Sequence, residues 1–234
     1  MTEDKKYNLT AIILAAGTGT RMNCARTKQR IELLGESVLS HTVKSFNAAS
    51  TVDNIIVVCR AEELDEIKAE LSGKYVKFTS QTVGGCCRFE SAKLGFSVAL
   101  RDSRYVAIHD AARCLVTPEQ IDSVAMAAFD CGAATASAPI TDTLKYAEGG
   151  VIDHTVSRYG MYCAQTPQIF ESSLYERALN SFSGDPSLIT DDNMLVELAG
   201  GHIALVDTGR ENIKITTKED LDYAEFILKK RSIQ

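Results

Sequence analysis

Short apolar runs alternate with amphipathic segments along most of this chain. The runs are rich in Ile, Val and Ala, which is typical of parallel strands that are buried on both faces of a sheet. We expect strands at Thr10–Leu14, Asn54–Cys59, Val76–Thr79, Tyr105–His109, Ala133–Ala138, Ile203–Val206 and Ile213–Ile215.

The segments between these runs have the spacing of apolar residues that favours helices. We expect helices at Val38–Ala48, Glu62–Leu71, Glu90–Leu100, Pro118–Phe129, Ser172–Phe182, Asp191–Ala199 and Lys218–Lys230. Thr117 precedes a first-turn proline and a glutamine three residues later, and Thr217 begins a similar capping pattern.

Alternation of strands and helices predicts an α/β fold, Rossmann-like and doubly wound around a mostly parallel sheet. A length of 234 residues with no linker suggests one domain over residues 1–234. In such folds, ligands bind outside the carboxyl ends of the strands. The ends of the predicted strands are therefore where chemistry is expected.

One segment, at about residues 139–160, breaks the alternation. It contains the turn Glu148-Gly-Gly150 between two short runs, which predicts a projecting β-hairpin arm. A two-stranded hairpin is marginally stable alone, so we expect the arm to pack on a second copy of the chain in a homodimer.

The composition excludes several classes of protein. A net charge of −6 is unlike that of a generic nucleic-acid binder, which is more often basic, and no apolar stretch has membrane-spanning length. The seven cysteines contain no C-x-x-C pair and read as reduced thiols rather than as a disulfide frame or a zinc site. We expect a cytoplasmic protein that binds neither nucleic acid nor membrane.

The first predicted strand leads directly into a loop of small residues, Ala15-Ala-Gly-Thr-Gly-Thr-Arg-Met22, with Lys28 six positions after it. Small residues let backbone N–H groups approach a ligand, and Arg21 and Lys28 add positive charge, which predicts a phosphate-binding loop. The glycine spacing fits neither a Walker loop nor a dinucleotide fingerprint. The alternative is an ordinary glycine-rich turn.

Asp110 follows the strand at Tyr105–His109, in the motif His109-Asp-Ala-Ala-Arg113. A carboxylate beside a phosphate site suits Mg²⁺, which takes one or two carboxylates and fills its other positions with water and phosphate oxygens. The alternative is an aspartate that caps a helix.

Two further groups of residues suit phosphate-containing ligands. Gly84-Gly85 would allow close backbone approach, and Ser91 offers a hydroxyl; the intervening Cys86 and Cys87 are expected to be inert. Two cations and a hydroxyl would suit a phosphate monoester, although spacing does not show that they converge, and each alone could be a surface residue. These three residues are Arg158, Thr166 and Lys214.

These motifs, in this order, resemble those of the 2-C-methyl-D-erythritol 4-phosphate cytidylyltransferase family over about residues 9–230. The remaining matches are Asp142-Thr143, Gln165-Thr-Pro-Gln168, Thr190-Asp-Asp192 with Leu195-Val-Glu197, and Asn212-Ile-Lys-Ile-Thr216. The resemblance implies transfer of CMP from CTP to a sugar-alcohol phosphate, with Mg²⁺ as cofactor and pyrophosphate as the second product.

The resemblance also implies roles for individual residues. Arg21 and Lys28 would stabilise charge at the reacting phosphates, Asp110 would bind the metal and nucleotide, and the arm of a dimer would complete the neighbouring acceptor site. The implied nucleotide-binding residues are Ala15, Ala16, Gly17, Thr18, Gly85 and Ser91. The implied acceptor-binding residues are Arg158, Thr166 and Lys214.

Two other functions remain open at this point. One is a D-ribitol 5-phosphate cytidylyltransferase, and the other is a non-catalytic nucleotide-binding regulator on the same fold. The retained Arg21 and Lys28 disfavour a regulator, which needs affinity for a nucleotide but no transition-state charge. The chain departs from the family at Thr27, where proline is usual, and at Cys86, where many members have an acid.

Overall fold

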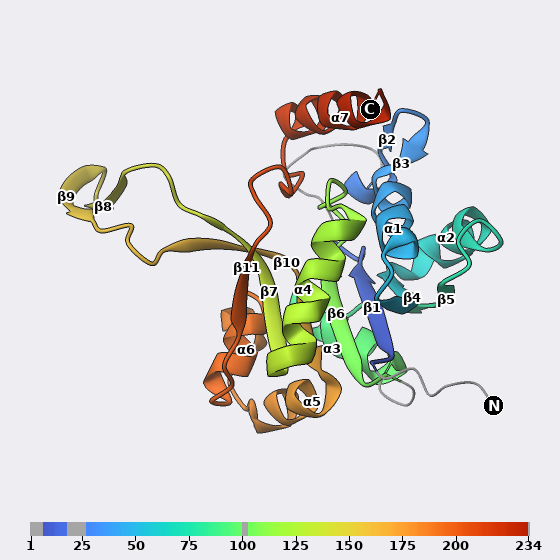
Figure 1. The fold of residues 1–234 in the computed structure, drawn as a ribbon, viewed down its shortest axis with the longest axis horizontal. Helices are drawn as coiled ribbons and strands as arrows, with labels where there is room; N and C mark the ends of the chain where they lie inside the picture. Colours follow the sequence, from blue (N-terminus) through green and yellow to red (C-terminus); the bar gives the residue numbers. More distant parts are fainter. Residues whose placement is uncertain (1–6, 18–26, 100–102, 234) are drawn as a thin grey trace.

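The computed structural model describes residues 7–17, 27–99 and 103–233. Its main sheet consists of β1 (Leu9–Leu14), β4 (Val52–Cys59), β5 (Phe78–Val83), β6 (Tyr105–Asp110), β7 (Ala133–Pro139), β10 (Tyr162–Glu171) and β11 (Ala204–Asp207). The order across the sheet is β11-β7-β10-β6-β1-β4-β5, and β10 alone of these seven runs antiparallel to its neighbours. The predicted α/β class with a mostly parallel sheet is therefore confirmed (Figure 1).

Helices cover both faces of this sheet because its central strands are apolar on both faces. In β1, Ala11 and Ile13 pack in one core cluster and Ile12 in the other. The first cluster lies under α1 (Val38–Ala48), α2 (Leu64–Leu71) and α4 (Pro118–Cys131). The second lies under α3 (Arg88–Ala99), α5 (Ser172–Ser181) and α6 (Asp192–Leu198).

A third, smaller apolar cluster lies under α7 (Lys218–Ser232). It joins that helix to β2 (Glu32–Leu33) and to the start of α1. Short 3₁₀ turns complete the described elements, and their bounds are η2 (Lys28–Arg30), η3 (Ala61–Glu63) and η4 (Pro186–Leu188), with β3 at Glu36–Ser37.

The capping predictions for two helices are confirmed. Thr117 accepts a hydrogen bond from the backbone N–H of Gln120, whose side chain bonds back to Thr117, and Thr217 and Asp220 form the same box at α7. These caps fix the start of each helix.

The predicted arm is also present. β8 (Leu144–Glu148) and β9 (Val151–Val156) form a separate antiparallel sheet, joined by a turn in which Gly149 and Gly150 have φ of 57° and 82°. Two successive positive φ values are the geometry of a two-residue hairpin turn, which glycine adopts at little cost. Figure 1 shows this hairpin projecting from the body, beyond the ends of β7 and β10.

Two strand predictions are wrong, and one strand was missed. β5 begins at Phe78 rather than Val76 and extends to Val83. It is an edge strand paired with β4, so it tolerates polar residues, and these gave no apolar pattern in the sequence. Ile213–Ile215 is not a strand, because Ile213 and Ile215 pack into the cluster under α7. β10 was not predicted, since Gln165-Thr-Pro-Gln168 interrupts its apolar pattern.

Within the described residues, none of the helices has the length and apolar character needed to span a membrane.

Candidate active site

A cavity lies where four parallel strands of the main sheet end. The segments after β1, β4, β5 and β6 form its wall, and its volume is about 530 Å³. The lining residues used below are Ala16, Gly17, Gly85, Arg88, Ser91, Asp110 and Lys214. The site therefore occupies the edge of the sheet where the fold class places ligands.

The loop after β1 contributes part of this wall. Ala16 and Gly17 line the cavity, and the side-chain amide of Gln29 donates a 3.2 Å hydrogen bond to the carbonyl of Gly17. Ala15 instead packs in the core, and its backbone N–H donates to the carbonyl of Val58 at 2.7 Å. This bond continues the sheet to the start of the loop.

The two predicted catalytic cations are only partly located. Arg21 and Thr18 lie outside the described residues, and the backbone of Lys28 begins η2. Thr27, where the family usually has proline, donates from its hydroxyl to Glu63 at 2.6 Å. This bond ties the segment before Lys28 to the body of the protein.

The loop after β5 packs tightly against the loop after β1. A Cβ atom on Gly84 would lie 2.5 Å from the Cβ of Ala16 and 2.8 Å from the Oγ of Ser91. Only glycine fits at this position without displacing one of these groups. The backbone N–H of Gly85 donates to Ser91 Oγ at 3.1 Å, so the predicted residues Gly85 and Ser91 lie together at the cavity.

Asp110 lies at the centre of the charged part of the site. Its Oδ1 accepts from Arg88 Nε at 3.2 Å, and its Oδ2 accepts from Lys214 Nζ at 2.7 Å. Burial opposes ionisation of this carboxyl group, but the charges of Arg88 and Lys214 outweigh burial and hold its pKa well below its usual range. Asp110 is thus an ionised carboxylate between two cations, not a helix cap.

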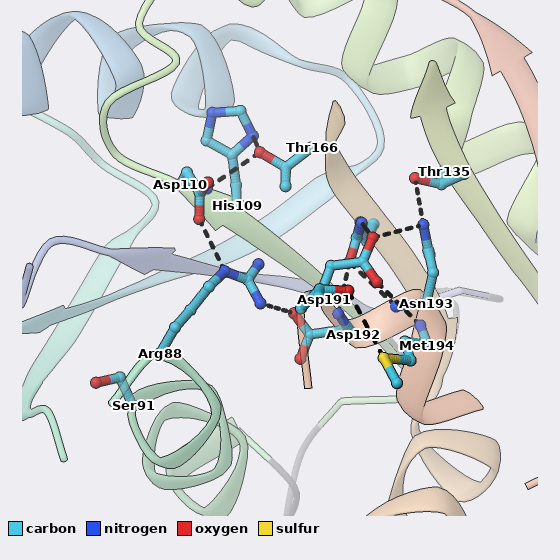
Figure 2. A network of polar contacts seen from close by, with 12 residues as sticks. Arg88, Ser91, His109, Asp110, Thr135, Thr166, Asp191, Asp192, Asn193 and Met194 are labelled. Carbon is cyan, nitrogen blue, oxygen red and sulfur yellow. Dashed lines mark hydrogen bonds and ion pairs between the residues drawn. The ribbon is translucent and has the colours of Figure 1, made fainter. Parts of the chain in front are cut away.

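Arg88, the first residue of α3, joins Asp110 to the start of α6. Its Nη1 lies 2.6 Å from Oδ2 of Asp192 (Figure 2). The other oxygen of Asp192 accepts from the hydroxyl of Tyr175. Burial lowers the pKa of Arg88, but the nearby Asp192 and Asp110 outweigh this effect and raise it. Its Nη2 is buried and has no hydrogen-bond partner among the described residues.

Thr166 connects Asp110 to a buried histidine. Its Oγ1 accepts from the backbone N–H of Asp110 at 3.1 Å and lies 3.0 Å from Nδ1 of His109 (Figure 2). The carbonyl of Arg113 lies 3.3 Å from Nε2 and can only accept, so a neutral imidazole carries its proton on Nε2. Nδ1 then accepts from the threonine hydroxyl. Burial lowers the pKa of His109 to about 3, in agreement with a neutral ring.

A smaller cavity of about 220 Å³ adjoins the first. Arg88, Asp110 and Lys214 line both cavities, and Arg113, Gln165, Thr166 and Gln168 line the smaller one. The structure therefore brings together Asp110, Thr166 and Lys214, which the spacing in the sequence did not establish. Arg158 does not join them: it is exposed between β9 and β10 and lines neither cavity.

Sequence reasoning assigned no role to the residues that hold this arrangement. Gln168 accepts from the backbone N–H of Asp192 at 3.0 Å and donates to Asp191 at 2.8 Å, and Asp191 caps α6. These residues stand in two motifs noted above, Gln165-Thr-Pro-Gln168 and Thr190-Asp-Asp192. The motifs were the available signal for these residues. The contact of Asp192 with Arg88 had no signal in the sequence.

The fold and this pair of cavities define a nucleotide-binding α/β protein of the nucleotidyltransferase type. Comparison with known proteins gives the family: residues 9–230 match the family model of 2-C-methyl-D-erythritol 4-phosphate cytidylyltransferase, and the chain belongs to this family of enzymes.

Similar proteins match over nearly their whole length. The protein of this name from Caldanaerobacter subterraneus subsp. tengcongensis is 39% identical over 95% of this chain and 100% of its own, and that from Alkaliphilus oremlandii is 36% identical over 94% of each chain. The crystal structure of 4-diphosphocytidyl-2C-methyl-D-erythritol synthase from Anaerococcus prevotii superposes with a TM-score of 0.83, at 30% identity, over 95% of this chain and 96% of that one.

Proposed function

We propose that this protein transfers CMP from CTP to 2-C-methyl-D-erythritol 4-phosphate, which gives 4-diphosphocytidyl-2-C-methyl-D-erythritol and pyrophosphate for isoprenoid synthesis by the non-mevalonate route. The family and its named relatives support the reaction. The observation that carries the assignment to this site is the wall of Arg88, Asp110 and Lys214 between two cavities of unequal size. The larger cavity suits the nucleotide and the smaller one the acceptor.

The reaction needs no general base, because a phosphate monoester is already a competent nucleophile at neutral pH. An acceptor phosphate oxygen bonds to the α-phosphorus of CTP while the bond to the leaving pyrophosphate breaks. Catalysis then consists of positioning and of stabilising the charge that builds at the phosphorus and the leaving group. We assign that stabilisation to Arg21 and Lys28.

The cations of the smaller cavity suit the acceptor phosphate. Lys214 is part-exposed beside Asp110, and Arg113 is half-buried with its Nη1 donating to the carbonyl of Asn212 at 2.8 Å. The hydroxyl proton of Thr166 is used in the hydrogen bond to His109. Thr166 can therefore position the acceptor substrate or accept a hydrogen bond from it, but cannot donate one.

Mg²⁺ is the proposed cofactor, and the chemistry of the donor set fits it. Asp110 provides an ionised oxygen donor at the boundary of both cavities, which matches the preference of Mg²⁺ for one or two carboxylates with phosphate oxygens. The ion, when bound, would neutralise charge on the triphosphate. Lys214 shares the same carboxylate, so it would be the partner that gives way to the ion.

We also infer that the chain acts as a homodimer in the cytoplasm. Large apolar side chains on the arm are exposed, with Val151 at 72% and Ile152 at 61%. Arg158, beside the arm, lines neither cavity described above. A neighbouring chain that receives the arm would cover these apolar side chains and could use Arg158 in its own site. The described cysteines are all free thiols, which supports a reducing compartment.

The deciding experiment is release of pyrophosphate from CTP, with methylerythritol phosphate and ribitol 5-phosphate as acceptors in parallel reactions. We expect turnover with the first and little with the second. Preference for ribitol 5-phosphate would overturn the acceptor assignment, and nucleotide binding without turnover on either would indicate a regulator. Parallel reactions with ATP, GTP and UTP test the choice of base.

A further inference from the structure

Two thiols and a carboxylate converge at the edge of the larger cavity, in a group to which the reaction gives no role. One ligand atom each of Cys86, Cys87 and Glu90 lies within 4.8 Å of the other two. Both cysteines line the cavity, and both are free thiols. Cys86 is exposed, while Cys87 and Glu90 are part-buried.

The local backbone holds this group in place. Glu90 folds back over the loop, where its Oε2 accepts from the backbone N–H of Cys86 at 2.8 Å. A Cβ atom on residue 85 would lie 2.3 Å from the Cβ of Glu90, so glycine at this position permits the fold-back. The carbonyl of Cys87 accepts from Ser91 Oγ at 2.9 Å, which fixes the second cysteine to the first turn of α3.

The types of donor select the class of ligand. Two sulfurs and one carboxylate oxygen are ligands for Zn²⁺ and related thiophilic ions, whereas Mg²⁺ and Ca²⁺ prefer oxygen alone. Three protein ligands leave a coordination position open, which is typical of zinc sites that hold water or an exchangeable ligand. This cluster is therefore chemically distinct from the proposed Mg²⁺ position at Asp110.

We propose that Cys86, Cys87 and Glu90 form a binding site for a thiophilic divalent cation of the Zn²⁺ class at the edge of the nucleotide cavity. Binding replaces two thiol protons, which are released to solvent, by one dication held by two thiolates and a carboxylate. The net charge of the cluster stays the same, so the ion acts on the cavity through its bulk and through fixing the two side chains.

The test uses Cd²⁺ as a spectroscopic probe of the reduced full-length protein without substrates. Titration should develop the ultraviolet sulfur-to-cadmium absorption band and saturate at one ion per chain, and Zn²⁺ should compete for the site. Cys86→Ser and Cys87→Ser should each weaken binding at least about tenfold, because each removes a thiolate ligand. Glu90→Gln should weaken binding less, because a thiophilic ion depends more on sulfur than on oxygen.

Cys131→Ser is the matched control, since Cys131 is an exposed thiol at the end of α4 and lines neither cavity. Its titration should equal that of the parent. The proposal is overturned if the variants at Cys86 and Cys87 retain the parent affinity, or if Cys131→Ser loses it. Circular dichroism of each variant separates a lost site from a lost fold.

A second readout concerns the nucleotide and rests on the proposed function. Zn²⁺ bound at this position should raise the CTP concentration that is needed for half-saturation, and Cys86→Ser should remove this effect. A protein that binds Cd²⁺ as described but does not bind CTP would sustain the metal site and reject the nucleotide assignment. The two proposals therefore fail separately.

Discussion

Lys214 Nζ lies 2.7 Å from Asp110 Oδ2, although the two residues are 104 positions apart in the chain. The other oxygen of Asp110 accepts from Arg88. The three linked side chains line both cavities and form the boundary between them. Asp110 is the carboxylate that lines both cavities.

Asp110→Asn should lower turnover by at least about 10²-fold, because the amide provides no negative ligand for Mg²⁺ and no charge between Arg88 and Lys214. Turnover at several Mg²⁺ concentrations checks this, with Asp53→Asn as a control on β4, away from both cavities. Turnover of Asp110→Asn at the level of the parent would remove Asp110 from the metal site.

Lys28→Ala should lower kcat by about 10²–10³-fold, as is typical for loss of one group that stabilises transition-state charge. Affinity for CTP should fall far less, since the charge on the ground-state nucleotide is already shared with other groups. Steady-state kinetics and equilibrium binding of CTP measure the two effects. Lys68→Ala on α2 is the control, and equal losses in turnover and affinity would contradict the assignment.

Thr166→Val should raise the KM for the acceptor by about tenfold, because it leaves the Asp110 N–H and His109 Nδ1 without a shared hydroxyl. Thr166→Ser keeps the hydroxyl and should restore most of the loss. KM values for both substrates show whether the effect is confined to the acceptor. No rescue by serine would mean that the methyl group, not the hydroxyl, matters.

Arg158→Ala should raise the KM for the acceptor and leave that for CTP nearly unchanged. If the arm serves a neighbouring site, inactive Asp110→Asn chains and Arg158→Ala chains should complement one another when mixed. Half of the randomly formed dimers would contain one complete site. At an acceptor concentration too low for Arg158→Ala dimers to turn over, activity should therefore recover to about a quarter of the parent value. Mixtures that stay as inactive as the separate variants would reject the shared site.

Stability should fall on acidification because of His109. The ring is neutral in the folded protein, with a pKa lowered to about 3, whereas in the unfolded chain it binds a proton below about pH 6.5. The unfolded state thus binds more protons between these values, and at pH 5 the folded state loses about 2 kcal/mol relative to pH 7. Denaturant unfolding at both pH values measures the difference.

His109→Gln removes the titrating ring and should reduce the pH 7-to-5 loss by about 2 kcal/mol, whatever its effect on stability at pH 7. His202→Gln is the control, since that histidine is exposed after α6. A loss in His109→Gln as large as in the parent would show that His109 does not remain neutral in the folded protein.

The sequence predicted the elements that carry strong local signals. Apolar runs predicted β1, β4, β6 and β7, and the capping patterns at Thr117 and Thr217 predicted the starts of α4 and α7. β10 escaped prediction because its middle contains a proline and three polar residues that interrupt the apolar run. Its pairing with β7 is irregular between Ala164 and Gln168.

The candidate site was predictable as motifs but not as geometry. Residue types placed Asp110 and the glycine loops at strand ends, where a parallel sheet gathers them. The contacts of Arg88 with Asp192 and of Lys214 with Asp110 each join residues 104 positions apart, and no local pattern encodes such pairs. Among the described residues, Arg158 lines neither cavity, so its role is not assigned by the site of one chain.

β10 carries both the base of the arm and the site. Tyr162, at one end, pairs with Pro139 beside the arm, while Thr166 and Gln168 lie further along the same strand at the smaller cavity. A neighbour that binds the arm therefore acts on the segment that receives the acceptor. Acceptor affinity and subunit association become linked quantities: any factor by which one strengthens the other applies equally in reverse.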